Sequence, residues 1–227
     1  VDRPRAAVHR EQKAVPQQTR VPKARLFNYK RASAQMQRFF REEIEDIHFI
    51  AALKQESLNL PIGGGVSEIS VLRITLRSPE LSEKVLSHID TGIPRATLFE
   101  IVRPNGEVQV AGAFKRQSEA DKSKWVTDAH YRTVWLPADY ERLPLPAAIH
   151  WGQLYAGLLR AVWPYRAWEG ESLTDQAARL HKIKSQEREV ERLAKQTSRE
   201  TQFNRKVEIN EKYKAARAEL RALTHGE

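Results

Sequence analysis

The feature that most constrains the fold is a long, charge-dense segment from about Thr174 to Leu223, in which apolar residues recur every three or four positions. Such spacing draws a single apolar stripe along a helix. The stripe lapses between Ala194 and Thr201, in a stretch with neither proline nor glycine. The segment therefore predicts an antiparallel helical hairpin or coiled-coil-like tail, with one long helix as the alternative. The stripe consists of Leu173, Ala177, Leu180, Ile183, Val190, Leu193, Phe203, Val207, Tyr213, Ala216, Leu220 and Leu223.

Composition bounds the rest of the chain. Of its 227 residues 41% are apolar and 30% are charged, which suits one domain with a sizeable core plus an appendage. The absence of cysteine excludes disulfides and thiolate metal sites. No apolar run approaches the roughly 20 residues needed to cross a bilayer, and no apolar segment of the signal-peptide kind follows the basic amino end. We therefore expect a cytoplasmic protein without membrane contact.

The net charge of +9 is unevenly distributed. The first 34 residues hold nine Lys and Arg against one Asp and one Glu, a net charge of +7. Residues 1–25 therefore predict a basic extended arm that could track phosphates, with Arg20, Lys23 and Arg25 as the candidate DNA-binding residues. The charges are not interleaved with aromatic side chains, so the stacking component of nucleic-acid binding is missing. The alternative is an extension that lies on a neighbouring protein subunit.

Residues 26–170 predict a compact mixed domain. Apolar residues recur at helical spacing from Arg31 to about Gln55, which predicts a helix buried on one side. A stretch rich in β-branched residues, 68–76, predicts a strand covered on both faces. Ser78, directly ahead of a Pro-Glu pair, predicts the N-cap of a second helix.

A second strand is expected at residues 96–103, and the strand-helix-strand order favours parallel pairing. Asn105-Gly106 then predicts a type I′ turn into an antiparallel third strand. Residues 125–136 predict one or two more strands, and residues 143–164 predict a helix that ends at Pro164. The fold class is therefore α+β, a four- or five-stranded mixed sheet flanked by helices, followed by the helical tail at 171–227.

Few residues carry chemistry. The seven histidines lack the spacing of a zinc or di-iron site, and the chain has no phosphate-binding loop or nucleophile elbow. Gly63-Gly64-Gly65 precedes a strand rather than a helix, so it predicts a flexible joint. His88 and Asp90 end the second helix, where we expect a cap or turn role. The sequence predicts no metal site and no cofactor.

Glu100 and Lys115 are weak catalytic candidates. A metal-dependent nuclease needs carboxylates and a lysine that converge on a strand. Glu100 lies on the second predicted strand and Lys115 at the end of the third, so the two could approach across the hairpin. The competing interpretation is a cross-strand ion pair. A divergent metal-dependent nuclease is accordingly an alternative function.

Five blocks resemble the bacterial domain-of-unknown-function 4391 family and follow the same order: VPKARLFNY, LKQESLNLP, HIDTGIPRATLFEI, YRTVWLP and ETQFNRKVEINEKYKAARAELRAL. The resemblance covers about residues 21 to 223, and QFNRKVEIN and IDTGIP are its most specific parts. Members of that family are typically encoded beside a helicase and a DNA methyltransferase. The resemblance implies an accessory subunit of a restriction-like or phage-defence system, and it brings no catalytic residue.

Both lines lead us to expect a non-enzymatic assembly subunit that docks on a helicase or DNA methyltransferase through its C-terminal helices. The expected partner-binding residues are Phe203, Val207, Tyr213 and Leu220, while the basic arm touches DNA or the partner. The same helices are candidates for contacts in a homo-oligomer. A plain DNA-binding module is the third alternative.

Overall fold

The computed structural model describes the chain apart from residues 1–8, 11–14, 25, 27–31, 122–123 and 226–227. It divides into two compact units, Val1–Pro164 and Tyr165–Glu227. The boundary falls a few residues before position 171, where the sequence predicts the tail to begin.

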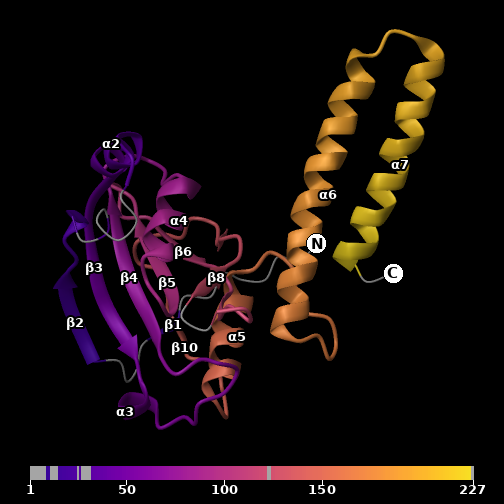
Figure 1. Ribbon diagram of the computed structural model, residues 1–227. Coiled ribbons are helices and arrows are strands. Elements are labelled where there is room, and N and C mark those ends of the chain that lie inside the picture. Colours follow the sequence, from indigo (N-terminus) through magenta and orange to yellow (C-terminus); the bar gives the residue numbers. More distant parts are fainter. Residues whose placement is uncertain (1–8, 11–14, 25, 27–31, 122–123, 226–227) are drawn as a thin grey trace. The chain divides into compact units, whose positions relative to one another are not determined.

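The first unit is built on a six-stranded mixed sheet with the order β2-β3-β4-β5-β6-β9 (Figure 1). Its strands are β2 (Val15–Arg20), β3 (Ile44–Leu53), β4 (Ile69–Leu76), β5 (Ala96–Val102), β6 (Val108–Gly112) and β9 (Tyr131–Arg132). β4 and β5 are parallel, as predicted, and the other neighbours are antiparallel. The predicted α+β class is confirmed, although the sheet has more than the four or five strands expected.

Two small ribbons and six helices complete the described architecture. β1 pairs with β10, and β7 pairs with β8. These elements are β1 (His9–Arg10), β7 (Lys115–Gln117), β8 (Trp125–Thr127), β10 (Leu143–Pro144), α2 (Ala34–Glu43), α3 (Gln55–Leu58), α4 (Glu83–Thr91) and α5 (Trp151–Val162) in the first unit. The helices α6 (Leu173–Arg199) and α7 (Phe203–His225) form the second unit.

The predicted helix over residues 31–55 is wrong in its second half. α2 ends at Glu43, and the chain passes directly into β3. The pairing of β3 with β4 contains two irregularities, and each bulge adds an unpaired residue to one strand. As a result the fully buried Ile44 and Ile47 lie three positions apart rather than two or four. The bulges therefore give a strand the apolar spacing that indicates a helix.

The edge strand β2 comes from the predicted basic arm. It pairs antiparallel with β3, with Arg20 opposite His48. Pro16 within this strand is compatible with an edge position, because an edge strand needs hydrogen-bond donors on one side only. This part of the arm is consequently integrated into the sheet.

The start of α4 is shifted from its predicted place. Its N-cap is Ser82, whose side chain accepts a hydrogen bond from the Val85 amide, rather than Ser78. The Ser78 hydroxyl instead donates to the carbonyl of Glu80 at 2.5 Å. Two serines in this segment offer a cap, and the helix begins at the second of them.

The β5–β6 hairpin forms where predicted, but its turn type differs. The amide of Gly106 donates to the carbonyl of Arg103 at 2.9 Å, which makes Pro104 and Asn105 the central residues. Gly106 follows them with a φ of +86°. Among the described non-glycine residues only Asn59 has a positive φ, so the φ of Asn105 is negative. This is a type I turn followed by a left-handed glycine, and it suits the fixed negative φ of proline.

Hydrophobic clusters lie on both faces of the sheet. On one face α2 and α4 pack against β3, β4 and β5, and the buried residues are Leu26, Phe40, Ile44, Ile47, Leu72, Ile74, Leu76, Leu81, Val85, Leu86, Ile89, Phe99, Ile101 and Ala111. On the other face Val162 of α5 packs with Val110 of β6. The two faces bury alternate residues of the same strands, which fixes their register.

The glycine-rich loop before β4 packs closely against the start of α5. A Cβ placed on Gly152 would lie 2.8 Å from the carbonyl oxygen of Gly63, and one placed on Gly63 would lie 2.6 Å from Nδ1 of His150. Gly64 and Gly65 have φ values of +62° and +72°, as a type I′ turn requires. The predicted joint is therefore a point of close backbone approach.

The second unit is an antiparallel helical hairpin, so the alternative of one long helix is wrong (Figure 1). The Gln186 side chain on α6 donates to the Ala216 carbonyl of α7 at 3.2 Å. Leu193, Ile209 and Ala216 are buried in the seam between the helices, with Val190 and Tyr213 packed against them. The sequence places the break within 194–201, and α6 ends at Arg199.

Arg179 closes the end of the hairpin where α6 begins and α7 ends. Its guanidinium binds both carboxylate oxygens of Glu171, at 2.7 and 2.8 Å. It also donates to the carbonyls of Arg166 at 2.8 Å and Leu223 at 3.1 Å, and it lies 4.2 Å from the centre of the Trp168 ring. One side chain thus ties the segment before α6 to the last turns of α7.

We expect Gly152→Ala to destabilise the protein by about 1–3 kcal/mol, although alanine normally stabilises a helix relative to glycine. The added Cβ would collide with the backbone of Gly63, which has little room to move. Urea unfolding is the measurement. A gain in the free energy of unfolding, which is the usual effect of this exchange within a helix, would contradict the explanation.

We expect Arg179→Ala to speed amide hydrogen exchange in the last turns of α7, because the Leu223 carbonyl and Glu171 lose their shared donor. The free energy of unfolding should fall by on the order of 3 kcal/mol, as is typical when one partner of a buried ion pair is removed. The control is Arg192→Ala, which removes an exposed ion pair to Glu189 and is worth under about 1 kcal/mol. Unchanged exchange at the end of α7 would refute this role.

Candidate functional site

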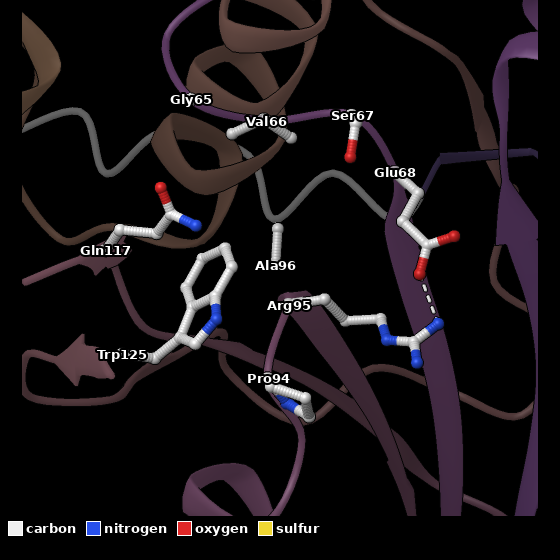
Figure 2. A pocket seen from close by; sticks show the side chains of 9 residues that line it. All are labelled: Gly65, Val66, Ser67, Glu68, Pro94, Arg95, Ala96, Gln117 and Trp125. Atoms are coloured by element: carbon white, nitrogen blue, oxygen red, sulfur yellow. Dashed lines mark hydrogen bonds and ion pairs between the residues drawn. The ribbon is translucent and has the colours of Figure 1, made fainter. Parts of the chain in front are cut away.

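A pocket of about 220 Å³ opens at the edge of the sheet where the parallel strands β4 and β5 begin (Figure 2). It is lined by Gly65, Val66, Ser67, Glu68, Pro94, Arg95, Ala96, Gln117 and Trp125. An ion pair between Arg95 and Glu68 forms one wall, and the ring of Trp125 from the β7–β8 ribbon forms another. The pocket is therefore a small, partly polar recess with one aromatic wall.

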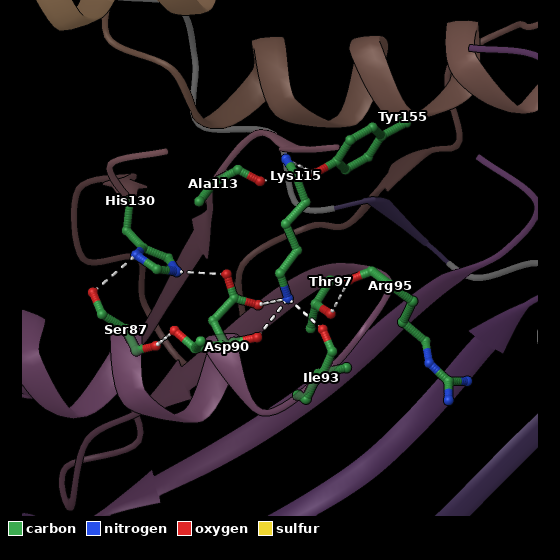
Figure 3. A network of polar contacts seen from close by, with 10 residues as sticks. Ser87, Asp90, Ile93, Arg95, Thr97, Ala113, Lys115, His130 and Tyr155 are labelled. Carbon is green, nitrogen blue, oxygen red and sulfur yellow. Dashed lines mark hydrogen bonds and ion pairs between the residues drawn. The ribbon is translucent and has the colours of Figure 1, made fainter. Parts of the chain in front are cut away.

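A buried polar network lies behind this recess, centred on Asp90 at the end of α4 (Figure 3). The ammonium of Lys115 donates to Asp90 Oδ1 at 2.6 Å, and to the carbonyls of Asp90 at 2.6 Å and Ile93 at 2.7 Å. All three of its donors are thus used. A cation at this place also complements the carbonyls and the partial negative charge at the end of a helix.

The network continues from Asp90 to His130 and Ser87. Nε2 of His130 lies 2.9 Å from Asp90 Oδ2, and Nδ1 lies 3.4 Å from the Ser87 hydroxyl. The residue types are those of a hydrolase triad. However, the side chains of Asp90 and His130 are 1% exposed, and the lining of the recess includes neither of them nor Ser87. The arrangement holds α4 to the chain around β7 and presents no reacting group to the recess.

Burial governs protonation in this network. Desolvation lowers the pKa of Lys115, and the nearby Asp90 carboxylate opposes that shift. Burial likewise raises the pKa of Tyr155, whose hydroxyl donates to the Ala113 carbonyl at 2.8 Å and accepts from the Lys115 amide at 3.1 Å. Each polar group is matched to a fixed partner, as a buried network requires.

Glu100 does not meet Lys115. Its carboxylate on β5 binds Arg73 of β4 at 2.6 Å through Oε1 and Arg142 at 2.6 Å through Oε2. The competing prediction, an ion pair between Glu100 and Lys115 across the hairpin, is also wrong. Glu100 pairs with Arg73 on the neighbouring strand β4, and Lys115 pairs with Asp90. In the part of the chain that the structure describes, no cluster of three or more His, Cys, Asp or Glu is arranged to hold a metal ion.

The candidate DNA-binding residues have separate surroundings. Arg20 on β2 is 70% exposed and forms an ion pair with Asp46 at 2.6 Å. The ammonium of Lys23 donates to the Ile44 carbonyl at 2.6 Å, and burial, followed by the charge of Arg77, lowers its pKa. Arg25 lies outside the described residues. Arg20 is the one of the two described candidates whose charge faces solvent.

The four candidate partner-binding residues also divide into two groups. Phe203 is 76% exposed and Val207 is 46% exposed, at the start of α7. Tyr213 packs in the seam of the hairpin and Leu220 is half-buried. Only the first two lie on open surface.

Among the described helices none is both long and apolar enough to cross a membrane.

Sequence reasoning missed the partners of these groups. His130 and Arg142 reach Asp90 and Glu100 from 40 and 42 positions away, and no local spacing announces such contacts. Asp90 could have been found only as an acid at the C-terminal end of a helix, an unfavourable place for a negative charge. The Glu171–Arg179 pair is closer in sequence, but it depends on how the segment before α6 folds back.

We expect Lys115→Met to lower the free energy of unfolding by about 3–5 kcal/mol, because Asp90 and two carbonyls lose their buried donor. The double variant Asp90→Asn/Lys115→Met should recover part of that loss, since it removes the uncompensated charge. The matched control is Lys124→Met, at a side chain that is 75% exposed and worth under about 1 kcal/mol. A loss below about 1 kcal/mol for Lys115→Met in urea unfolding would contradict the role of the network.

Comparisons with known proteins give one result. No curated protein and no solved structure matches the chain significantly. A family profile described as Domain of unknown function (DUF4391) matches residues 11–220, which confirms the resemblance seen in the sequence. The chain belongs to this family, the domain of unknown function DUF4391.

Proposed function

We propose that the protein is a non-enzymatic accessory subunit of a bacterial restriction-like or antiphage defence complex, which docks on a helicase or DNA methyltransferase through its C-terminal helices. The observation that carries the proposal is the exposure of Phe203 and Val207 at the start of α7. Fully burying an aromatic or aliphatic side chain stabilises a contact by about 1.5–3 kcal/mol. A partner that covered Phe203 and Val207 would gain this free energy for each of them.

The seam of the hairpin does not use these two residues. Its buried contacts come from Leu193, Ile209 and Ala216. Phe203 and Val207 are four positions apart, so they lie on one face of α7 and present one apolar surface. Such paired anchors, rather than scattered single residues, are typical of an interaction site.

The catalytic candidates favour an accessory role over a nuclease. Both oxygens of Glu100 are bound by arginines, and all three donors of Lys115 are bound by Asp90 and two carbonyls. A carboxylate held by two guanidinium groups is a poor ligand for a catalytic divalent cation, because the arginines already satisfy it. DNA contact, through Arg20 on the edge strand, is a subsidiary part of the proposal.

The test is mass-resolved co-purification of the tagged full chain from its native host, at low and high salt and after nuclease treatment. We expect wild type to retain a helicase or DNA methyltransferase under all three conditions, and Phe203→Asp/Val207→Asp to lose it. Two buried anchors lost at an interface weaken binding by about 3 kcal/mol or more, roughly a hundredfold.

The matched control is Ala218→Asp, which adds a carboxylate to an exposed site on the same helix. It should leave co-purification unchanged. Circular dichroism should show equal helix content for the wild-type chain and both variants. Retention of the partner by the folded Phe203→Asp/Val207→Asp chain would refute docking through this surface.

A further inference from the structure

The net positive charge of the second unit lies at one end of its hairpin. We call Lys195–Val207 the tip; it comprises the end of α6, the connection and the first turn of α7. The tip contains Lys195, Arg199, Arg205 and Lys206 against one acid, Glu200, a net charge of +3. The remaining residues of the unit, 165–194 and 208–227, hold ten basic and ten acidic side chains. The rest of the unit is thus neutral.

Most basic residues of the tip form no ion pair with a described residue. The same is true of Arg188 and Lys212 along the helices, so the excess of positive charge, not the pairing, sets the tip apart. At the tip Lys195 binds Glu191 at 2.5 Å, but Arg199, Arg205 and Lys206 form no ion pair with any described residue. Three cations therefore remain available to an anionic surface.

Cations lie at several sides of the exposed apolar pair. Lys206, three positions after Phe203, adjoins it on the surface of α7, Arg205 lies on the opposite side of the same turn, and Arg199 ends α6 just across the connection. An apolar centre with a charged rim is the usual anatomy of a protein–protein contact. The rim sets the rate and selectivity of association, and the centre supplies most of the affinity.

We infer that the tip docks end-on into an acidic surface of the partner protein, with an apolar socket for Phe203 and Val207. This inference rests on the proposed function and specifies the chemistry of the partner. It also confines the contact to the tip, because Tyr213 farther along α7 is occupied by the seam.

A protein surface fits the tip better than a nucleic acid does. Glu200 lies within the tip and Glu208 directly follows Val207, so a phosphate backbone would meet both carboxylates. A protein can place a basic or neutral group opposite each of them. Val207 has no flat face on which a base could stack, whereas an apolar socket accepts it as readily as Phe203.

The first experiment reverses the rim charges in the full chain. We expect Arg205→Glu/Lys206→Glu to lower recovery of the helicase or methyltransferase partner about tenfold at low salt, since attraction becomes repulsion at two positions. The control, Lys212→Glu/Lys214→Glu, makes the same charge change farther along α7 and should retain the partner. Equal recovery of the tip variant and wild type would overturn the inference.

The second experiment identifies the surface that the tip meets. The chain has no cysteine, so Asn204→Cys provides a unique attachment point for a photo-crosslinker at an exposed tip position. The expected product is a crosslink to a partner peptide with net negative charge. A crosslink to a neutral or basic peptide, or to nucleic acid, would overturn the inference.

The outcomes separate the inference from the proposed function. If Phe203→Asp/Val207→Asp loses the partner while Arg205→Glu/Lys206→Glu keeps it, docking stands and the acidic surface is wrong. If both variants keep the partner, both proposals fail. If nuclease treatment releases the partner from wild type, nucleic acid bridges the two and both proposals fail in their present form.

Discussion

Lys115 carries a positive charge into the interior of the first unit and uses all three of its donors there. The ammonium binds the side chain and carbonyl of Asp90 and the carbonyl of Ile93, and so holds the end of α4 and the turn that leads into β5. β4, α4 and β5 form the parallel centre of the sheet, on which both faces of the core are packed. A buried ion pair of this kind adds little net stability, but it permits few alternative arrangements because any other one leaves a charge unpaired.

Much of the fold follows from local sequence pattern. The strands β4 and β5, their parallel pairing, the hairpin at Asn105-Gly106 and the helical hairpin are all written in short-range periodicity and turn residues. The strand β3 is not, because the bulge between Ile44 and Asp46 gives Ile44 and Ile47 a helix-like spacing. This spacing is compatible with both a helix and a bulged strand. Pairing with the neighbouring strands β2 and β4 makes the segment a strand.

The contacts of the candidate site residues do not follow from local sequence pattern either. The sequence shows that Glu100 and Lys115 are ionisable groups on strands, but their partners come from distant segments: Arg142 for the one, Asp90 for the other. In the tail, the stripe suggests that Phe203 and Val207 share a face with the seam. The structure instead buries Ile209, which the stripe omits, and leaves those two on the surface. Pairing between helices sets the phase of α7, and a single sequence does not show it.

The contacts of Arg179 and the tip lie at opposite ends of the same hairpin. Arg179 lies 20 residues before Arg199, the last residue of α6, and at about 1.5 Å per residue this part of the helix spans roughly 30 Å. The tip therefore lies about the diameter of a small domain away from the residues that Arg179 binds. In the complex that we propose, the hairpin is a spacer of defined length, and the number of helical turns between Arg179 and the tip sets the reach at which the partner is held.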